Sequence, residues 1–346
     1  MSDLPARPNL DQLRHQAKDL LHAAQQGDAE ALSRVVAVAG PVRLSAAQLA
    51  VAREYGFSSW AALKLEVERR DILDRGDVAR LVELLTAHPE LATRRLAHWS
   101  DGNRNRPLAY VTKMRFYHDQ AGAPADVSGT GALARALLAA GAPVNGRRRD
   151  KETPLITAAS YGDAEVARVL IEAGADLDTT SAPDAGGVPG GSALLHAAVF
   201  GMTEIVDLLV AAGARADSLE TAAAAGDISD WPLAETDVQA RIRALIFAAD
   251  HQRLDVIDQL ITAGTPVNQP DRDYQRLPLH VAAHHGRPAS IRRLLDHGAD
   301  PNLADPNGHT PLELCTAPAG ADRRAYVEAT AILRSLTRPE GPIHNP

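Results

Sequence analysis

Cysteine and aromatic residues are scarce in this chain of 346 residues. A single cysteine, Cys315, is present, and Phe, Tyr and Trp together make up 4% of the sequence. One cysteine excludes an internal disulfide, so packing and hydrogen bonds have to hold the fold together. A sequence rich in Ala and Leu but poor in large rings favours thin helical layers that pack through small side chains.

Long apolar segments and export signals are also missing. No run of 18 apolar residues occurs, so we expect no membrane-spanning helix and no membrane partner. The first residues, MSDLPARPNLDQ, lack the charged and apolar regions of a signal peptide. With the single cysteine, these absences predict a cytoplasmic protein in a reducing compartment.

Basic residues are too few for a nucleic-acid interface. The chain carries 36 Lys and Arg against 44 Asp and Glu, a net charge of −8. Its one basic triplet, Arg147-Arg148-Arg149, is followed at once by Asp150. A nucleic-acid-binding protein would usually show a basic face, so we predict no nucleic-acid partner.

Known catalytic motifs are absent as well. The sequence has no P-loop, HExxH zinc helix, nucleophile elbow or CxxC pair. The glycine-rich stretch 186–191 precedes an expected helix with no strand before it, and Pro189 makes it a poor phosphate site. We therefore interpret it as a flexible loop tip. We predict no cofactor and no enzymatic activity.

One stretch, residues 273–302, shows the pattern that organises the chain. A short inner helix begins at Leu277-Pro278-Leu279-His280, a turn follows at Gly286, and an outer helix ends before Gly298. The closing glycines Gly264 and Gly298 are 34 positions apart. The pattern recurs elsewhere, at Thr153-Pro154-Leu155, Leu194-Leu195-His196-Ala197-Ala198 and Thr310-Pro311-Leu312.

This pattern resembles the ankyrin repeat family, whose units are about 33 residues long. The resemblance implies an all-α ankyrin repeat solenoid of about seven units over residues 71–336. Two irregularities are expected within it, an insertion at about 112–131 and a degenerate unit at about 219–238. About six extra residues also fall in the loop 179–191, because Gly174 and Gly213 are 39 positions apart.

The ends of the chain do not carry the repeat pattern. Residues 1–70 read as an N-terminal helical cap that covers the exposed apolar face of the first repeat. The segments LRHQAKDLL and AREYGFSSWAAL resemble the helical region often found ahead of ankyrin repeats in bacterial proteins. Residues 337–346 contain three prolines and are expected to be disordered.

The chain contains 13 histidines, and those of the stretch above could suggest a metal site. His280 and His284 lie four positions apart, so on a helix they would share a face, and His285 is adjacent. In ankyrin repeats, however, a histidine at the position of His280 is buried and bonds the turn of the neighbouring unit. The pattern assigns His196 to the same position, so we predict structural roles and no metal.

A second group of residues is predicted to contact a partner. In the ankyrin family, the two residues before the mid-repeat glycine face the concave groove. The turn tips are the other usual contact surface, where Tyr and Arg are common binding hot spots. The predicted contact residues are Lys113, Met114, Tyr161, Phe200, His251 and His285 in the groove, with Tyr274 and Arg276 at a tip. Alternatively, the groove rings cover the neighbouring inner helix and contribute only to packing.

The resemblance implies a non-catalytic module, expected to be monomeric, that binds a protein partner through the groove and the turn tips. A competing hypothesis is a small-molecule binder or enzyme whose pocket is closed by the insertion. The pocket residues would be Arg115, Tyr117, His118, Tyr161 and His196, which could combine a basic clamp with acid-base groups. A third hypothesis is an immunity or regulatory protein that masks a co-encoded effector with the same surface as the first.

Overall fold

The computed structural model describes residues 4, 9–39, 41–97, 105–114, 129–318 and 321–336. Across these residues every regular element is a helix, and Thr180 and Ser192 form an isolated antiparallel bridge. The predicted all-α class is therefore confirmed. None of the helices in the described ranges is long and apolar enough to cross a membrane.

The chain divides into two compact units. The first comprises residues 1–114 and 127–146, and the second comprises residues 115–126 and 147–346. The predicted tail 337–346 and most of the predicted insertion 112–131 lie outside the described residues. The predicted domain boundaries stay predictions.

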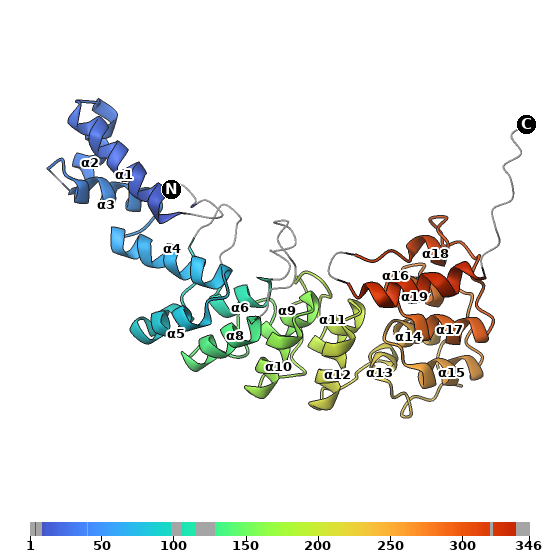
Figure 1. The fold of residues 1–346 in the computed structure, drawn as a ribbon. Coiled ribbons are helices and arrows are strands. Elements are labelled where there is room, and N and C mark those ends of the chain that lie inside the picture. Colours follow the sequence, from blue (N-terminus) through green and yellow to red (C-terminus); the bar gives the residue numbers. More distant parts are fainter. Residues whose placement is uncertain are drawn as a thin grey trace, which may run out of the picture. The chain divides into compact units, whose positions relative to one another are not determined.

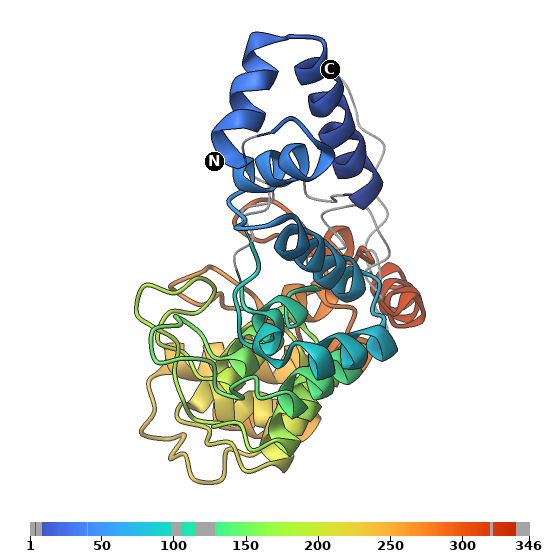
Figure 2. The same cartoon turned by 90° about the vertical axis from the view of Figure 1, so that its left-hand side faces the viewer.

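The first unit begins with three helices that pack on one another, α1 (Leu10–Gln25), α2 (Ala29–Ala39) and α3 (Leu44–Glu54) (Figure 2). Their packed faces consist of small and branched apolar residues, including Leu13, Ala17, Val35, Ala47 and Val51. Apolar positions three and four residues apart place these side chains on one face of each helix.

The rest of the first unit contains α4 (Trp60–Asp74), α5 (Val78–Ala87), the 3-10 turn η1 (Pro89–Ala92), α6 (Pro107–Val111) and α8 (Thr130–Ala139). Helix α4 is continuous through residue 70, where the cap was predicted to end. Its N-terminus is capped by Ser59, whose hydroxyl accepts a hydrogen bond from the Ala62 amide at 3.1 Å.

A buried ion pair fixes α4 to the segment that follows η1. Arg69 is 1% exposed, and its guanidinium donates to Glu66 at 2.5 Å and to the carbonyls of Leu91 and Arg94 at 3.1 and 2.9 Å. Burial lowers the pKa of Arg69, while Glu66 acts in the opposite direction. Glu66 also accepts from the Ala97 amide at 2.7 Å, so each of the two buried charges has further hydrogen-bond partners besides the other.

The second unit is built from helix pairs that form two rows (Figure 1). Helices of the inner row contact inner neighbours, and helices of the outer row contact outer neighbours. The inner helices are α9 (Pro154–Tyr161), α11 (Ala193–Val199), α13 (Leu219–Ala225), α14 (Val238–Asp250), α16 (Pro278–His284) and α18 (Pro311–Leu314). The outer helices are α10 (Ala164–Glu172), α12 (Thr203–Ala211), α15 (Leu254–Thr262), α17 (Pro288–Asp296) and α19 (Arg323–Arg334).

The turn between inner and outer helix is built on glycine for two reasons. Gly286 has φ +60°, a region that side chains rarely adopt, and a Cβ added there would lie 2.7 Å from the ring of Tyr326. Gly162 has φ +74°, and a Cβ there would lie 2.7 Å from the sulfur of Met202. These turns are therefore covered by a side chain from the following unit.

The unit around α13 lacks an outer helix. Residues 226–237 form a loop in its place, and α14 begins directly after it. Arg253, directly before α15, contacts the neighbouring elements that the missing outer helix would otherwise keep apart. Its guanidinium donates to the Ala224 carbonyl at 2.6 Å and to Asp207 on α12 at 2.5 Å. One long side chain thus connects α12, α13 and the start of α15.

Candidate functional site

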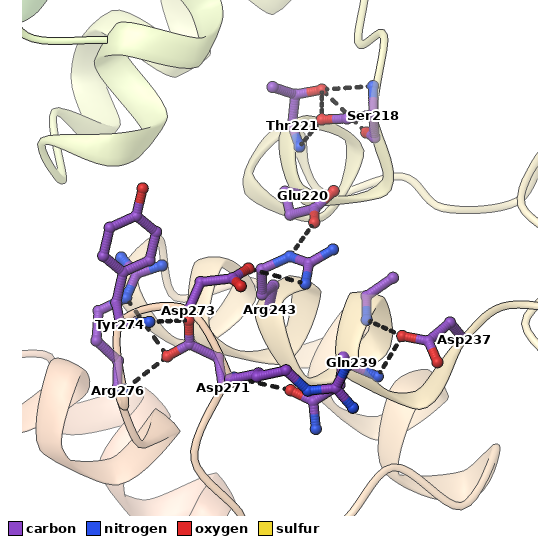
Figure 3. A network of polar contacts seen from close by, with 12 residues as sticks. Ser218, Glu220, Thr221, Asp237, Gln239, Arg243, Asp271, Asp273, Tyr274 and Arg276 are labelled. Carbon is purple, nitrogen blue, oxygen red and sulfur yellow. Dashed lines mark hydrogen bonds and ion pairs between the residues drawn. The ribbon is translucent and has the colours of Figure 1, made fainter. Parts of the chain in front are cut away.

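The turn tip at residues 271–276 is organised around a buried carboxylate (Figure 3). Asp271 is 0% exposed, and its side chain accepts hydrogen bonds from the backbone amides of Tyr274 at 3.1 Å and Arg276 at 2.5 Å. Hydrogen bonds to a charged acceptor contribute about 1.5–3 kcal/mol each when they are buried. Asp271 therefore holds the turn in one conformation.

The turn contains a residue in a costly backbone conformation. Gln275 has φ +56°, the left-handed region that costs a residue with a Cβ roughly 1–2 kcal/mol. Its amide donates to the Asp271 carbonyl at 3.0 Å, and its side-chain amide donates to the Arg272 carbonyl at 3.0 Å. The Arg272 amide donates to Gln239 on α14 at 2.8 Å. The surrounding hydrogen bonds offset the strain and fix the tip to the helix beneath it.

The fixed turn presents Tyr274 to solvent. Tyr274 is 72% exposed, more than any other large hydrophobic residue in the described ranges. The Arg276 guanidinium lies 5.0 Å from the centre of its ring and 5.7 Å from that of the buried Phe247. Such cation–π contacts hold the arginine between the core and the exposed ring. A large, rigid aromatic surface is thus available at low entropic cost.

Arg243 joins this tip to the neighbouring unit. Its guanidinium lies 2.7 Å from Glu220 on α13 and 3.4 Å from Asp273. Burial lowers the pKa of Arg243, but Glu220 and Asp273 outweigh this effect and leave the pKa raised. Arg243 therefore stays charged and connects the tip 271–276 to α13.

The predicted groove residues fall into two groups, and the first lies at the surface. Tyr161 is half-buried at the end of α9, and burial followed by the charge of Glu152 raises the pKa of its phenol. Phe200 is 36% exposed at the end of α11. His285 is half-buried, with Nδ1 2.6 Å from a carboxylate oxygen of the buried Asp250.

The second group is buried, which corrects the expected exposure. His251 is 1% exposed, its Nε2 donates to the Ala198 carbonyl at 2.9 Å, and its Nδ1 lies 3.0 Å from the Thr203 hydroxyl. This histidine at the end of α14 bonds α11 and the start of α12, beside the unit that lacks an outer helix. Met114 is also buried, at 0% exposed, whereas Lys113 is half-buried like Tyr161 and His285. Neither His251 nor Met114 is followed by a glycine, so their alignment with the other pairs did not rest on the mid-repeat glycine.

The predicted structural role of His280 is confirmed, and that of His196 is corrected in detail. His280 is buried, and its Nε2 lies 3.1 Å from the His309 carbonyl in the next turn. His196 lies five positions before its mid-repeat glycine, whereas His280 lies six before. Its Nε2 donates to the Val188 carbonyl at 2.9 Å, within the loop that precedes its own helix.

The loop 179–191 is anchored at both ends. The Ser181 amide donates to the Gly191 carbonyl at 2.9 Å, and the Ala182 amide donates to the Lys151 carbonyl at 2.7 Å. The Lys151 ammonium lies 2.8 Å from the Asp184 carboxylate, a surface pair that adds little stability by itself. One backbone hydrogen bond thus closes the loop that contains the stretch 186–191, and a second attaches the loop to the turn that precedes α9.

The residues considered for a metal site and for a closed pocket are described only in part. The described ranges contain no group of three His, Cys, Asp or Glu residues placed to hold a metal ion. Of the residues proposed for a closed pocket, Arg115, Tyr117 and His118 lie outside the described ranges. His196 is buried, and both of its ring nitrogens are hydrogen-bonded.

Comparison with protein families identifies two segments of the chain. A model of ankyrin repeats in many copies matches residues 260–315, and a model of three ankyrin repeats matches residues 125–220. The second segment includes the pairs α9–α10 and α11–α12, and the first includes the pair α16–α17. They agree with the resemblance inferred from the repeat pattern.

Curated relatives are similar to this chain over short segments. A palmitoyltransferase of Homo sapiens is 37% identical over 73 residues, which are 21% of this chain and 12% of that protein. A BTB/POZ domain and ankyrin repeat-containing protein of Lotus japonicus is 38% identical over 72 residues, covering 20% and 15%. The human 2-5A-dependent ribonuclease is 39% identical over 70 residues, covering 20% and 9%. The chain thus matches only a small part of each of these eukaryotic proteins.

A solved structure, the human ASB11 ankyrin repeat domain, is also similar to this chain. It is 20% identical, with a TM-score of 0.32, and the match covers 68% of this chain and 100% of that domain.

Proposed function

Since the chain is an ankyrin repeat protein, we propose that it recognises a protein partner without catalysing a reaction, and that the turn tip 271–276 is its principal anchor. Ankyrin repeats generally mediate protein–protein interaction. The observation that carries the proposal is Tyr274, a 72%-exposed aromatic residue on a turn held by the buried Asp271. Binding hot spots are enriched in tyrosine and arginine, and this tip presents both.

The groove contributes a second contact area in this proposal. Tyr161, Phe200 and His285 lie at or near the ends of inner helices and are each at least partly exposed. A partner segment that contacts Tyr274 would continue along these ends. We further propose that the protein acts as a monomer in the cytoplasm. Masking of a co-encoded effector would use this same surface.

The proposal is tested by affinity recovery of the tagged protein from its native lysate, with mass spectrometry of the retained proteins. Wild type is compared with Tyr274→Ala and with the control Val327→Ala, which removes a 69%-exposed side chain from α19. We expect a stoichiometric protein that wild type and the control retain and Tyr274→Ala loses. Equal recovery by all three chains would reject the tip as the anchor, and recovery of no protein would reject the proposed function.

A further inference from the structure

The loop 179–191 lies on the surface that the groove residues were predicted to present. A Cβ added to Gly187 would lie 3.3 Å from Cε1 of His196 and 3.6 Å from the ring of Phe200. A Cβ added to Gly191 would lie 3.1 Å from Cδ2 of His196. The backbone of the loop therefore rests directly on both rings. This contact covers part of the groove with the chain's own residues.

Hydrogen bonds define how the surface holds this segment. The Val188 carbonyl can only accept, so Nε2 of His196 carries the proton that it donates at 2.9 Å. Nδ1 of the neutral ring lies 2.7 Å from the Ser160 hydroxyl on α9, whose single proton is shared between this nitrogen and the Ile156 carbonyl at 2.9 Å. Ser160 thus orients the ring of His196, and His196 presents one N–H donor to whatever backbone lies above it.

The segment on this surface has a particular chemistry. Residues 182–191 read APDAGGVPGG, with two prolines and four glycines. Gly187 and Gly190 both have positive φ, +68° and +74°, but only Gly187 would bring a Cβ against the rings. The site therefore accepts a glycine between His196 and Phe200, followed by a carbonyl acceptor on the next residue.

We propose that Ser160, His196 and Phe200 form a recognition site for a glycine- and proline-containing turn of the partner protein, and that the loop 182–191 occupies this site in the free chain. The proposal rests on the proposed function and names the chemistry of one partner segment. The partner's segment has to displace the loop, which competes at the high effective concentration of an attached ligand. Binding at the groove is then gated by the chain itself.

The test uses the loop's own sequence as the probe. In a variant that lacks residues 184–189, the loop is shortened by about the number of residues by which it exceeds the loop of an ordinary repeat. The surface under the loop is then uncovered. A synthetic peptide of residues 182–191 is titrated into isotope-labelled deletion variant and into wild type, and binding is followed by NMR. We expect the peptide to bind the deletion variant, with shifts at Ser160, His196 and Phe200, and to bind wild type at least tenfold more weakly.

Two controls test the chemistry of recognition. The peptide with Gly187→Val should bind the deletion variant at least tenfold more weakly, because its side chain would lie against the two rings. The deletion variant with His196→Leu should also lose about tenfold in affinity, since it lacks the N–H donor. Equal binding of both peptides, or unchanged binding after His196→Leu, would overturn the assignment.

If the deletion variant does not fold by circular dichroism, Gly187→Val in the full chain provides the second route. Its side chain should expel the loop without shortening it, and the unmodified peptide should then bind. Failure of the peptide to bind either opened variant, or equal binding to wild type and opened chain, would overturn the proposal. These results are independent of whether Tyr274→Ala loses a partner, so the two proposals can fail separately.

Discussion

Two loops that each lead into an inner helix of the second unit differ in length and in what they expose. The tip 271–276 is short, and it projects Tyr274 to solvent from a turn held by Asp271. The loop 179–191 is longer, and it lies back on His196 and Phe200. In this chain the shorter loop presents its tip to solvent, whereas the longer loop covers part of the groove. We expect the two loops to respond differently to substitution.

Asp271→Ala should have the largest effect on stability, because it removes the buried carboxylate that holds the tip 271–276. The substitution removes the acceptor of the Tyr274 and Arg276 amides, which flank the strained Gln275 on both sides. We expect a loss of about 3 kcal/mol in the free energy of unfolding, measured by chemical denaturation. Asp273→Ala is the matched control, since Asp273 is exposed and its ion pair is worth at most about 1 kcal/mol. Equal losses for the two variants would contradict the role of Asp271.

The repeats themselves could be predicted from sequence because their signals are local. Thr153 caps α9 by accepting from the Ile156 amide at 3.2 Å, and Pro154 follows as the first helical residue. Gly286 ends an inner helix with positive φ. Such cues lie within a few residues of one another, so the helix pairs and the missing outer helix near α13 could be anticipated.

Gly187→Ala tests the covering loop with a smaller expected effect. Its control, Gly190→Ala, carries the same backbone strain but no neighbouring atom within 4 Å. We expect Gly187→Ala to reduce the free energy of unfolding by about 1 kcal/mol more than Gly190→Ala, because only the first methyl group meets the rings of His196 and Phe200. Differential scanning calorimetry of the two variants measures this difference. Identical melting curves would show that the loop does not rest on the rings.

The site was harder to predict because its contacts join residues far apart in the chain. The exposure of His251 was wrongly predicted, since the repeat register alone does not show that this residue bonds Ala198, which is 53 positions away. Asp271 was missed, although aspartate favours turns because its side chain hydrogen-bonds nearby backbone amides. The ion pair of Arg69 with Glu66 was missed as well, because adjacent charges on a helix usually face solvent.

Lowering the pH should affect the loop 179–191 but not the tip 271–276. This is the smallest of the expected energetic effects. Burial lowers the pKa of His196 below its ordinary value of 6.5, so between the two pKa values the unfolded chain binds more protons than the folded chain. The free energy of unfolding is therefore not reduced by His196 above about pH 6.5, and it decreases as the pH falls below this value. Burial lowers the pKa values of His251 and His280 in the same direction.

The measurement is the free energy of unfolding at pH 7.5 and pH 5.5 for wild type and His196→Gln. We expect wild type to lose more stability on acidification than the variant, which lacks one titrating group. In NMR spectra the amides of Gly187 and Val188 should shift over this pH range, while those of Tyr274 and Gln275 should not, since the tip 271–276 has no histidine. An equal pH dependence of the two chains would contradict the role assigned to His196.

The most direct test of the central claim is the dissociation constant of the purified partner for wild type and for Tyr274→Ala. We predict that the substitution weakens binding at least tenfold, about 1.4 kcal/mol or more, while the free energy of unfolding of the free chain changes by less than about 0.5 kcal/mol. Such a result would identify the exposed ring as a binding anchor. A dissociation constant within twofold of wild type would contradict the claim that the tip 271–276 anchors the partner.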